Sequence, residues 1–202
     1  MRYFVTAIGT DSGKTVVSAI LVKALQADYW KPIQAGFPTD TEIVKALIGS
    51  SSSRFHPEVY LLSTPESPHA AARRQGKKIM IKEIRVPETQ GDLIIEGAGG
   101  LMVPLNDHEL VVDMINNLEA EVILVANLYL GSINHTLLSV DCLNNKGIKI
   151  KGIVFNGPEN RESEEVILRY SGYPLILKIR QEDRIDSEVV EKYAHQLLKG
   201  WK

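Results

Sequence analysis

The fold is decided by residues 3–25, which read YFVTAIGTDSGKTVVSAILVKAL. An apolar run from Tyr3 to Ile8 predicts a strand, and a short loop after it ends in Gly13-Lys14-Thr15. The helix predicted from Thr15 to Ala27 is apolar almost all round, which is typical of a helix that packs deep against a sheet. A strand, a glycine-containing loop and a buried helix in this order are the context that a phosphate-binding P-loop requires.

Each residue type at the end of this loop suits phosphate binding. Gly13 has no Cβ to keep phosphate oxygens away from the backbone, and N–H groups at a helix start attract anions. Lys14 is expected to reach the β- and γ-phosphates, and the Thr15 hydroxyl to bind Mg²⁺. The strict pattern G-x-x-x-x-G-K-[ST] is not met, because its first glycine falls on Ile8. A helix that merely begins with Gly-Lys-Thr is the alternative, which the flanking strand and buried helix disfavour.

Short apolar runs alternate with helical patterns along the rest of the chain. Nearly continuous apolar runs predict strands that are buried on both faces of a parallel sheet. The predicted strands are 3–8, 93–95, 122–126, 150–155 and 175–177, with a weaker one at 29–33 that ends at a proline. The predicted helices are 15–27, 40–48, 68–75, 110–118, 134–145, 163–170 and 187–198. This alternation predicts an α/β fold with a doubly wound, mostly parallel sheet and helices on both faces, of the P-loop NTPase type.

Length, charge and cysteine content narrow the classes of function. A chain of 202 residues suits one domain spanning residues 1–202. A formal net charge of -2 gives no electrostatic reason to expect nucleic acid or a membrane as a partner. The basic residues at 73, 74, 77 and 78 are interpreted as a solvated helix face. Cys142 is the single cysteine, which excludes an intrachain disulfide and fits a cytoplasmic location.

Three further charged residues follow or interrupt predicted elements. Lys31 stands in a buried strand, where a lysine is costly unless it meets an anion, although a side chain that reaches solvent is the alternative. Glu96 follows the run Leu93-Ile94-Ile95 and precedes a glycine-rich loop, so its carboxylate is a candidate Mg²⁺ ligand. Asp40 opens a helix, and the residues alone leave N-capping and a metal role evenly matched.

Five segments carry a resemblance to a known family. They are GTDSGKT at 9–15, KPIQ at 31–34, PESPH at 65–69, EGAGG at 96–100 and GSINH at 131–135. Their order is the one found in dethiobiotin synthetases, and the chain resembles that family over essentially its whole length, most weakly in the last quarter. The resemblance implies that 7,8-diaminopelargonate, CO₂ and ATP give dethiobiotin, ADP and phosphate. A carbamate on one amine attacks the γ-phosphorus, and the second amine then closes the ureido ring.

The resemblance also implies roles for single residues. Lys31, Lys14 and Thr10 match catalytic or substrate-contacting positions, and Thr15, Asp40 and Glu96 match the Mg²⁺ ligands. The nucleotide-binding positions implied are Asp11, Ser12, Gly13, Lys14, Thr15, Val16, Glu96, Gly97, Ala98, Gly99 and Asn156, the last of which meets the nucleobase. The substrate positions implied are Ala35, Gly131, Ser132, Ile133 and Asn134. His69 is expected to be structural.

The last four of these substrate positions open a helix whose free N–H groups would receive the substrate carboxylate. In the family this carboxylate is bound by the other subunit, which implies a two-fold homodimer. Ordinary N-capping is the alternative role for Asn134. The chain departs from the family pattern at Ala7, Asp11 and Ala35, in a shortened helix after Ile81, and at residues 177–180, where a glycine and a proline are absent.

Three competing functions are weighed against the synthetase. A partitioning or site-determining ATPase of the same P-loop branch would carry a second lysine early in the loop, where this chain has Ile8 and Gly9. An amidation synthetase for a corrin-like acid would need a glutamine-hydrolysing domain, for which 202 residues leave no room. A nucleotide-binding module without catalysis is the third alternative.

Overall fold

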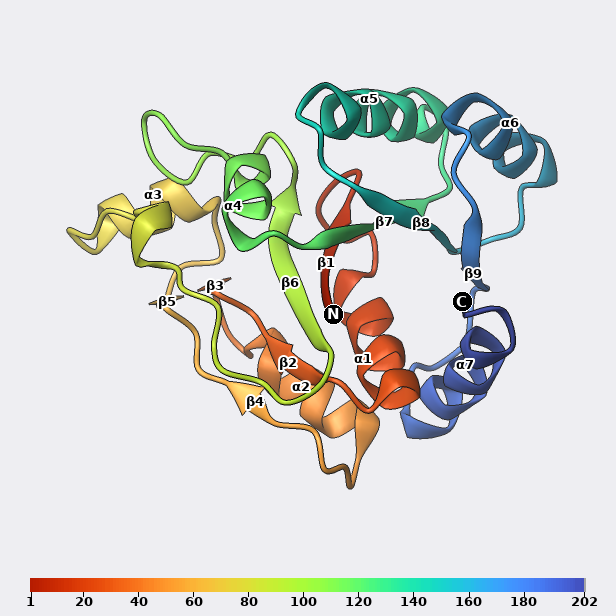
Figure 1. Ribbon diagram of the computed structural model, residues 1–202, viewed down its shortest axis with the longest axis horizontal. Helices are drawn as coiled ribbons and strands as arrows, with labels where there is room; N and C mark the ends of the chain where they lie inside the picture. Colours follow the sequence, from red (N-terminus) through yellow and green to blue (C-terminus); the bar gives the residue numbers. More distant parts are fainter. Residues whose placement is uncertain (202) are drawn as a thin grey trace.

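Seven parallel strands form the central sheet of the computed structural model, which describes residues 1–201 (Figure 1). The order across the sheet is β4-β2-β6-β1-β7-β8-β9. The strands are β1 (Arg2–Ala7), β2 (Asp28–Trp30), β4 (Phe55–His56), β6 (Leu93–Gly100), β7 (Glu121–Asn127), β8 (Ile150–Asn156) and β9 (Leu175–Ile179). Two short strands, β3 (Ile33–Ala35) and β5 (Tyr60–Leu62), pair in a separate parallel sheet. The P-loop therefore follows the central strand, where connections leave the sheet in both directions.

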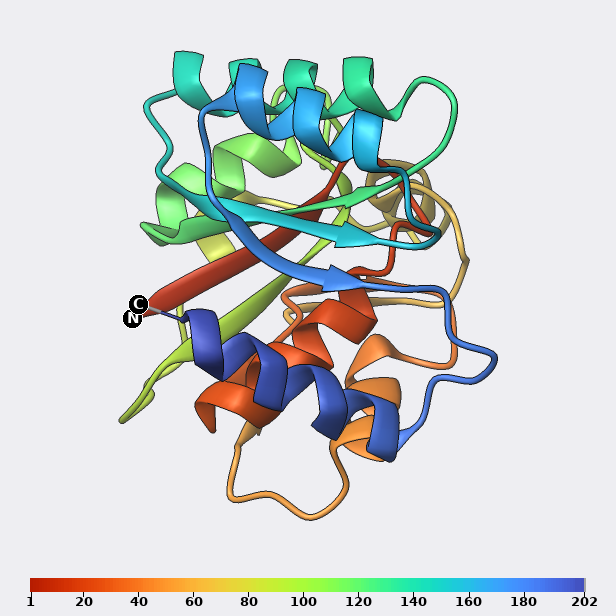
Figure 2. The ribbon, with the colours of Figure 1, turned by 90° about the vertical axis from the view of Figure 1, so that its right-hand side faces the viewer.

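Helices cover both faces of this sheet, as the alternating pattern predicted (Figure 2). One face carries α1 (Lys14–Leu25), α2 (Asp40–Ile48) and α7 (Ser187–Gly200), and the other carries α4 (Val111–Leu118), α5 (Ser132–Asn145) and α6 (Arg161–Ser171). The helix α3 (Pro68–Arg74) and a 3₁₀ turn, η1 (Ile81–Glu83), lie beside the small sheet. The turn stands where a shortened helix was expected.

The apolar side chains divide between two main layers, one under each set of helices. Val5 of β1 packs in a cluster with Val17 of α1, whereas its neighbour Phe4 packs in the cluster that holds Met114 of α4. Both strand residues are fully buried. A strand covered on both faces reads as a continuous apolar run, which is why β1, β7 and β8 were predictable.

The prediction of one strand over residues 29–33 is wrong, because the chain leaves the central sheet between Trp30 and Ile33. β2 ends at Trp30 and β3, in the other sheet, begins at Ile33. Pro32 has no N–H for a strand ladder, and its carbonyl instead accepts from the backbone of Val59 and Tyr60. Lys31 therefore lies at the junction of the two sheets.

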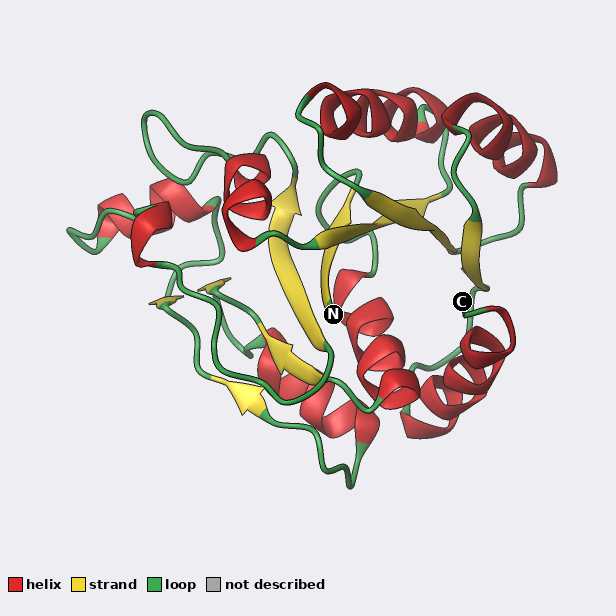
Figure 3. Ribbon diagram, viewed as in Figure 1, coloured by secondary structure: helices red, strands yellow, loops and turns green. Residues whose placement is uncertain are grey.

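The glycine-rich segment after Glu96 was expected to be a loop and instead continues the strand. β6 runs to Gly100, and Figure 3 shows it as one long strand. Glu96 pairs with Val5 and Gly100 with Ala7 of the central strand. A Cβ on Gly97 would lie 2.7 Å from the Phe4 ring, so glycine here allows the ring to pack against the strand.

Candidate active site

The phosphate loop is shaped by Gly13, the N-cap of α1. Its φ of 93° is a left-handed value, and a Cβ there would lie 2.2 Å from Asn156 Nδ2. Only glycine satisfies both restrictions. No side chain in the described part of the chain caps α1, so its first N–H groups are available to an anion.

Two strand ends across the sheet hold the loop in place. Ser12 Oγ donates to Asn127 Oδ1 at 2.7 Å, and Asn156 Nδ2 donates to the Ser12 carbonyl at 2.9 Å. Ser12 is fully buried, so it supports the loop from behind. Asn127 was missed by the sequence interpretation, although a polar residue directly after an apolar strand was the signal available.

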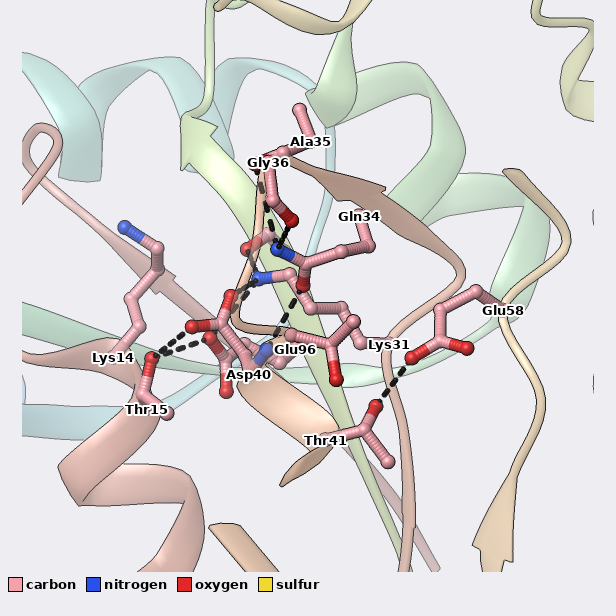
Figure 4. Close-up of polar contacts among 12 residues, drawn as sticks. Lys14, Thr15, Lys31, Gln34, Ala35, Gly36, Asp40, Thr41, Glu58 and Glu96 are labelled. Atoms are coloured by element: carbon pink, nitrogen blue, oxygen red, sulfur yellow. Dashed lines mark hydrogen bonds and ion pairs between the residues drawn. The ribbon is translucent and has the colours of Figure 1, made fainter. Parts of the chain in front are cut away.

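A group of opposite charges lies at the mouth of this loop (Figure 4). The Lys31 ammonium is 2.6 Å from Asp40 Oδ2, 3.0 Å from Glu96 Oε1 and 3.3 Å from the Gly97 carbonyl. Thr15 Oγ1 lies 3.0 Å from both Asp40 Oδ1 and Glu96 Oε1. Lys31 and Glu96 are 4% and 1% exposed, so the two charges meet in the protein interior.

The two lysines respond to this environment in opposite ways. Burial lowers the pKa of the Lys14 ammonium, and the positive charge of Lys31 lowers it further. Burial acts on Lys31 in the same direction, but the attraction of Glu96 and Asp40 outweighs it and raises the pKa of Lys31. Lys14 Nζ donates to the Gly9 carbonyl at 3.3 Å and lies apart from the carboxylates (Figure 4). Lys14 is therefore the ammonium that is free to meet a phosphate.

A cavity of about 850 Å³ opens onto this centre. The predicted residues that line it are Thr10, Asp11, Gly13, Lys14, Thr15, Val16, Lys31, Ala35, Asp40, Glu96, Ala98 and Gly99. Ser12 and Asn156 contact the back of the loop instead. His69, at the start of α3, does not line the cavity, and its buried Nδ1 has no hydrogen-bond partner within residues 1–201. Its structural role stays a prediction.

The start of α5 lies outside this cavity. Gly131 is its N-cap with a φ of 107°, and no side chain among residues 1–201 caps the helix. Ser132 Oγ is buried and lacks a hydrogen-bond partner in the described part of the chain. A second hollow of about 470 Å³ lies nearby, between the end of β6 and α5, and Thr10 borders both. The four residues Gly131, Ser132, Ile133 and Asn134 line neither hollow, so their substrate role stays a prediction.

The oxygen atoms of Thr15, Asp40 and Glu96 fit a magnesium ion. Mg²⁺ prefers hard oxygen ligands and usually completes its shell with water and substrate phosphates. Over residues 1–201 there is no group of three His, Cys, Asp or Glu side chains that could hold a metal. Two carboxylates and one hydroxyl beside a phosphate loop therefore suit a metal that arrives with a nucleotide.

Comparison with known proteins identifies the family. The family model described as an AAA domain matches residues 1–189. The ATP-dependent dethiobiotin synthetase BioD of Cytophaga hutchinsonii is 56% identical over 202 residues, covering 99% of this chain and 98% of that protein. The chain belongs to the dethiobiotin synthetase family. The corresponding protein of Christiangramia forsetii is 50% identical over 98% of this chain and 96% of its own length.

Solved structures outside the dethiobiotin synthetase family share the fold. The cell division ATPase MinD of Pyrococcus furiosus has a TM-score of 0.62 at 14% identity, covering 98% of each chain. A ParA family ATPase of Chlorobium tepidum has a TM-score of 0.58 at 13% identity, covering 98% of this chain and 95% of the other. These similarities confirm the predicted P-loop fold and say nothing about the reaction.

Two supporting side chains at the charged centre were missed by the sequence interpretation. Gln34 Oε1 accepts from the Asp40 backbone N–H at 3.1 Å, and Gln34 Nε2 donates to the Gly36 carbonyl at 3.1 Å. Tyr29 donates its hydroxyl proton to Glu96 Oε2 at 3.0 Å. Burial, aided by the charge of Glu96, holds the pKa of Tyr29 well above its usual range, so the phenol remains a donor.

The segment 177–180, which departs from the dethiobiotin synthetase pattern, is held by a buried carboxylate on α6. Glu164 is 2.5 Å from Lys178 Nζ and 2.8 Å from Arg180 Nη1. Burial raises the pKa of Glu164, but hydrogen bonds from these two cations outweigh it and lower the pKa. Ion pairs therefore fix the strand end that lies beside Asn156.

Proposed function

We propose that this chain makes dethiobiotin from 7,8-diaminopelargonate, CO₂ (or bicarbonate as its source) and ATP, releasing ADP and phosphate. The supporting observation is the buried contact of Lys31 with Asp40 and Glu96 at the mouth of the phosphate loop. These carboxylates raise the pKa of Lys31 and keep it protonated. A charged lysine beside an anion-binding helix start suits a reaction that collects negative charge on neighbouring groups. Membership of a family of ATP-dependent synthetases supports the same reaction.

The chemistry needs positioning more than acid–base exchange. An amine nitrogen forms a bond to CO₂ and loses a proton, which gives a carbamate. A carbamate oxygen then bonds to the γ-phosphorus as ADP leaves. The second amine bonds to the carbonyl carbon of this mixed anhydride, phosphate leaves and a proton is released. Holding reactants in line can lower such barriers by about 7–11 kcal/mol.

The lysines have separate roles in this proposal. Lys14 meets the terminal phosphates of ATP, because it starts α1 and forms no ion pair with a carboxylate of residues 1–201. Lys31 faces the same cavity and neutralises the carbamate and the transferred phosphoryl group. Thr15, Asp40 and Glu96 hold Mg²⁺, which neutralises charge on the phosphates when it is bound. Ser12 and Asn156 keep the loop in its binding shape. A contact of Asn156 with the nucleobase is part of the proposal and is supported by the family resemblance.

We propose a homodimer that completes the substrate site. Large apolar side chains are exposed around the second hollow, namely Met102, Tyr129, Leu130 and Leu138. The uncapped start of α5, with the unpartnered Ser132 hydroxyl, offers donors to a carboxylate. A second copy bringing its own α5 to this hollow would place those donors at the far end of the diamine.

No helix within residues 1–201 is long and apolar enough to cross a bilayer. A cytoplasmic location stays a prediction from the single cysteine.

The decisive experiment mixes purified protein with Mg²⁺, ATP, bicarbonate and 7,8-diaminopelargonate. We expect phosphate release that depends on the diamine, with dethiobiotin identified by mass spectrometry. Lys31→Ala should abolish product formation while nucleotide binding persists. Lys78→Ala, which removes an exposed lysine, is the control and should leave the rate unchanged. An ATP hydrolysis rate that does not change with the diamine but rises when DNA or lipid is added would instead support a partitioning ATPase.

A further inference from the structure

Tyr29 lies on the strand next to Glu96 and on the same face of the sheet. β2 pairs with β6 so that Tyr29 is opposite Ile94. Side chains two residues apart on a strand share a face, so Glu96 projects on the same side as Ile94. Both Tyr29 and Ile94 belong to the apolar cluster under α1. The tyrosine ring therefore runs along the sheet surface toward the carboxylate.

The two oxygens of Glu96 have different partners. Oε1 faces the proposed site, where it accepts from Thr15 and Lys31, each at 3.0 Å. Oε2 points into the core and accepts from the Tyr29 hydroxyl, also at 3.0 Å. The terminal torsion of a glutamate is broad and roughly two-fold, so one oxygen held by a fixed donor determines where the other points.

The tyrosine is itself held rigidly. Its side chain is 0% exposed, and its ring centroid lies 5.7 Å from that of Phe55 on β4. A buried hydroxyl without a hydrogen-bond partner is unfavourable, so the core favours the rotamer in which the phenol reaches Glu96. Packing thus fixes the phenol, and the phenol fixes the carboxylate.

We propose that Tyr29 is a positioning residue that orients Glu96 toward the metal. This inference rests on the proposed metal role of Glu96 within the proposed function. The hydroxyl holds the carboxylate plane, so that Oε1 faces the metal site without a rearrangement when the ion and nucleotide bind. Partners behind a metal ligand commonly control affinity in this way.

Tyr29→Phe removes only the hydroxyl and keeps the ring in its packing site. We expect Mn²⁺, added with a non-hydrolysable ATP analogue and followed by electron paramagnetic resonance, to bind about 10-fold more weakly. The KM for Mg²⁺ should rise, and the KM for the diamine should stay unchanged. Unaltered Mn²⁺ affinity would overturn the inference.

Tyr60→Phe is the matched control. Its buried phenol belongs to the cluster on the opposite face. The hydroxyl donates to Glu83 Oε2 at 2.5 Å and accepts from the Met80 N–H, so its hydrogen bonds do not go to Glu96. We expect Mn²⁺ affinity to match that of the wild-type chain. An equal loss in both variants would reveal a general effect of losing a buried hydroxyl and would overturn the positioning role.

A double variant separates orientation from core stability. With Glu96→Gln present, adding Tyr29→Phe should change Mn²⁺ affinity no further, because no carboxylate remains to orient. If Tyr29→Phe fails to fold alone but folds with Glu96→Gln, the hydroxyl acts on the carboxylate, as proposed. Failure of both to fold, or a further loss of affinity in the double variant, would overturn the proposal. A wild-type chain that binds Mn²⁺ as expected but makes no dethiobiotin would refute the proposed function alone.

Discussion

Gly13→Ala tests the shape of the phosphate loop directly. The added methyl group meets two obstacles, a left-handed backbone angle of 93° and the Asn156 amide at 2.2 Å. The first obstacle belongs to residue 13 alone. The second depends on a side chain that can be removed, so the two can be measured separately.

The expected cost follows from these two obstacles. A residue with a Cβ in the left-handed region loses about 1–2 kcal/mol. Moving Asn156 aside breaks its hydrogen bond to Ser12, which contributes about 0.5–1.5 kcal/mol, and an off-rotamer side chain costs about 0.5–1.5 kcal/mol. The unfolding free energy of Gly13→Ala should therefore fall by about 3.5 kcal/mol.

Urea denaturation of the wild-type chain, Gly13→Ala, Asn156→Ala and the double variant checks this free-energy difference. In an Asn156→Ala background, the same glycine substitution should cost only the backbone part, about 1.5 kcal/mol. Gly172→Ala is a control for that part, because its φ of 72° and ψ of 4° are also left-handed and its Cβ would meet nothing within 4 Å. A Gly13→Ala cost that is the same in both backgrounds would refute the contact between Gly13 and Asn156 as its cause.

Three further predictions concern charge. Lys31→Met leaves buried carboxylates unpaired, so it should lower the unfolding free energy by about 3 kcal/mol. Urea denaturation in metal-free buffer measures this loss. The pKa of Lys14 lies below the usual lysine range, so ATP affinity measured by calorimetry should fall as the pH rises through that pKa and the ammonium loses its charge. Lys14→Arg should not show this decline, because a guanidinium stays charged. Glu164→Gln should cost about 1.5–3 kcal/mol at neutral pH. The pKa of Glu164 is lower in the folded chain than in the unfolded chain, so the stability difference between wild type and Glu164→Gln is present above the unfolded-state pKa. It should vanish as the pH falls through the folded-state pKa. Denaturation midpoints of both chains at several pH values measure this difference.

The main strands could be predicted because a strand that is buried on both faces is a continuous run of apolar residues. β1, β7 and β8 are runs of apolar residues that end at Ala7, Asn127 and Asn156. The short strands β3, β4 and β5 could not, since two or three residues carry no measurable periodicity. The continuation of β6 through four small residues depends on the position of Phe4, which the local sequence does not contain.

The sequence predicted an anion near Lys31 and a metal role for Glu96, but it did not predict the direct contact between these two side chains. Lys31 directly follows β2 and Glu96 lies in the middle of β6, and these two strands are neighbours in the sheet. The roles of Tyr29 and Gln34 escaped prediction because they depend on side-chain direction, which composition and spacing do not specify. Residues 131–134 stay a prediction because one copy of the chain does not bring them to the charged centre.

The ties from Ser12 to Asn127 and Asn156 have a consequence for the order of events during synthesis. The phosphate loop is among the first segments to leave the ribosome, yet its two anchors lie more than a hundred residues later in the chain. A nascent fragment that lacks β7 and β8 carries the loop without its supports. We therefore expect the loop to reach its binding shape only after β7 and β8 have emerged, and we do not expect nucleotide to act as an early folding template.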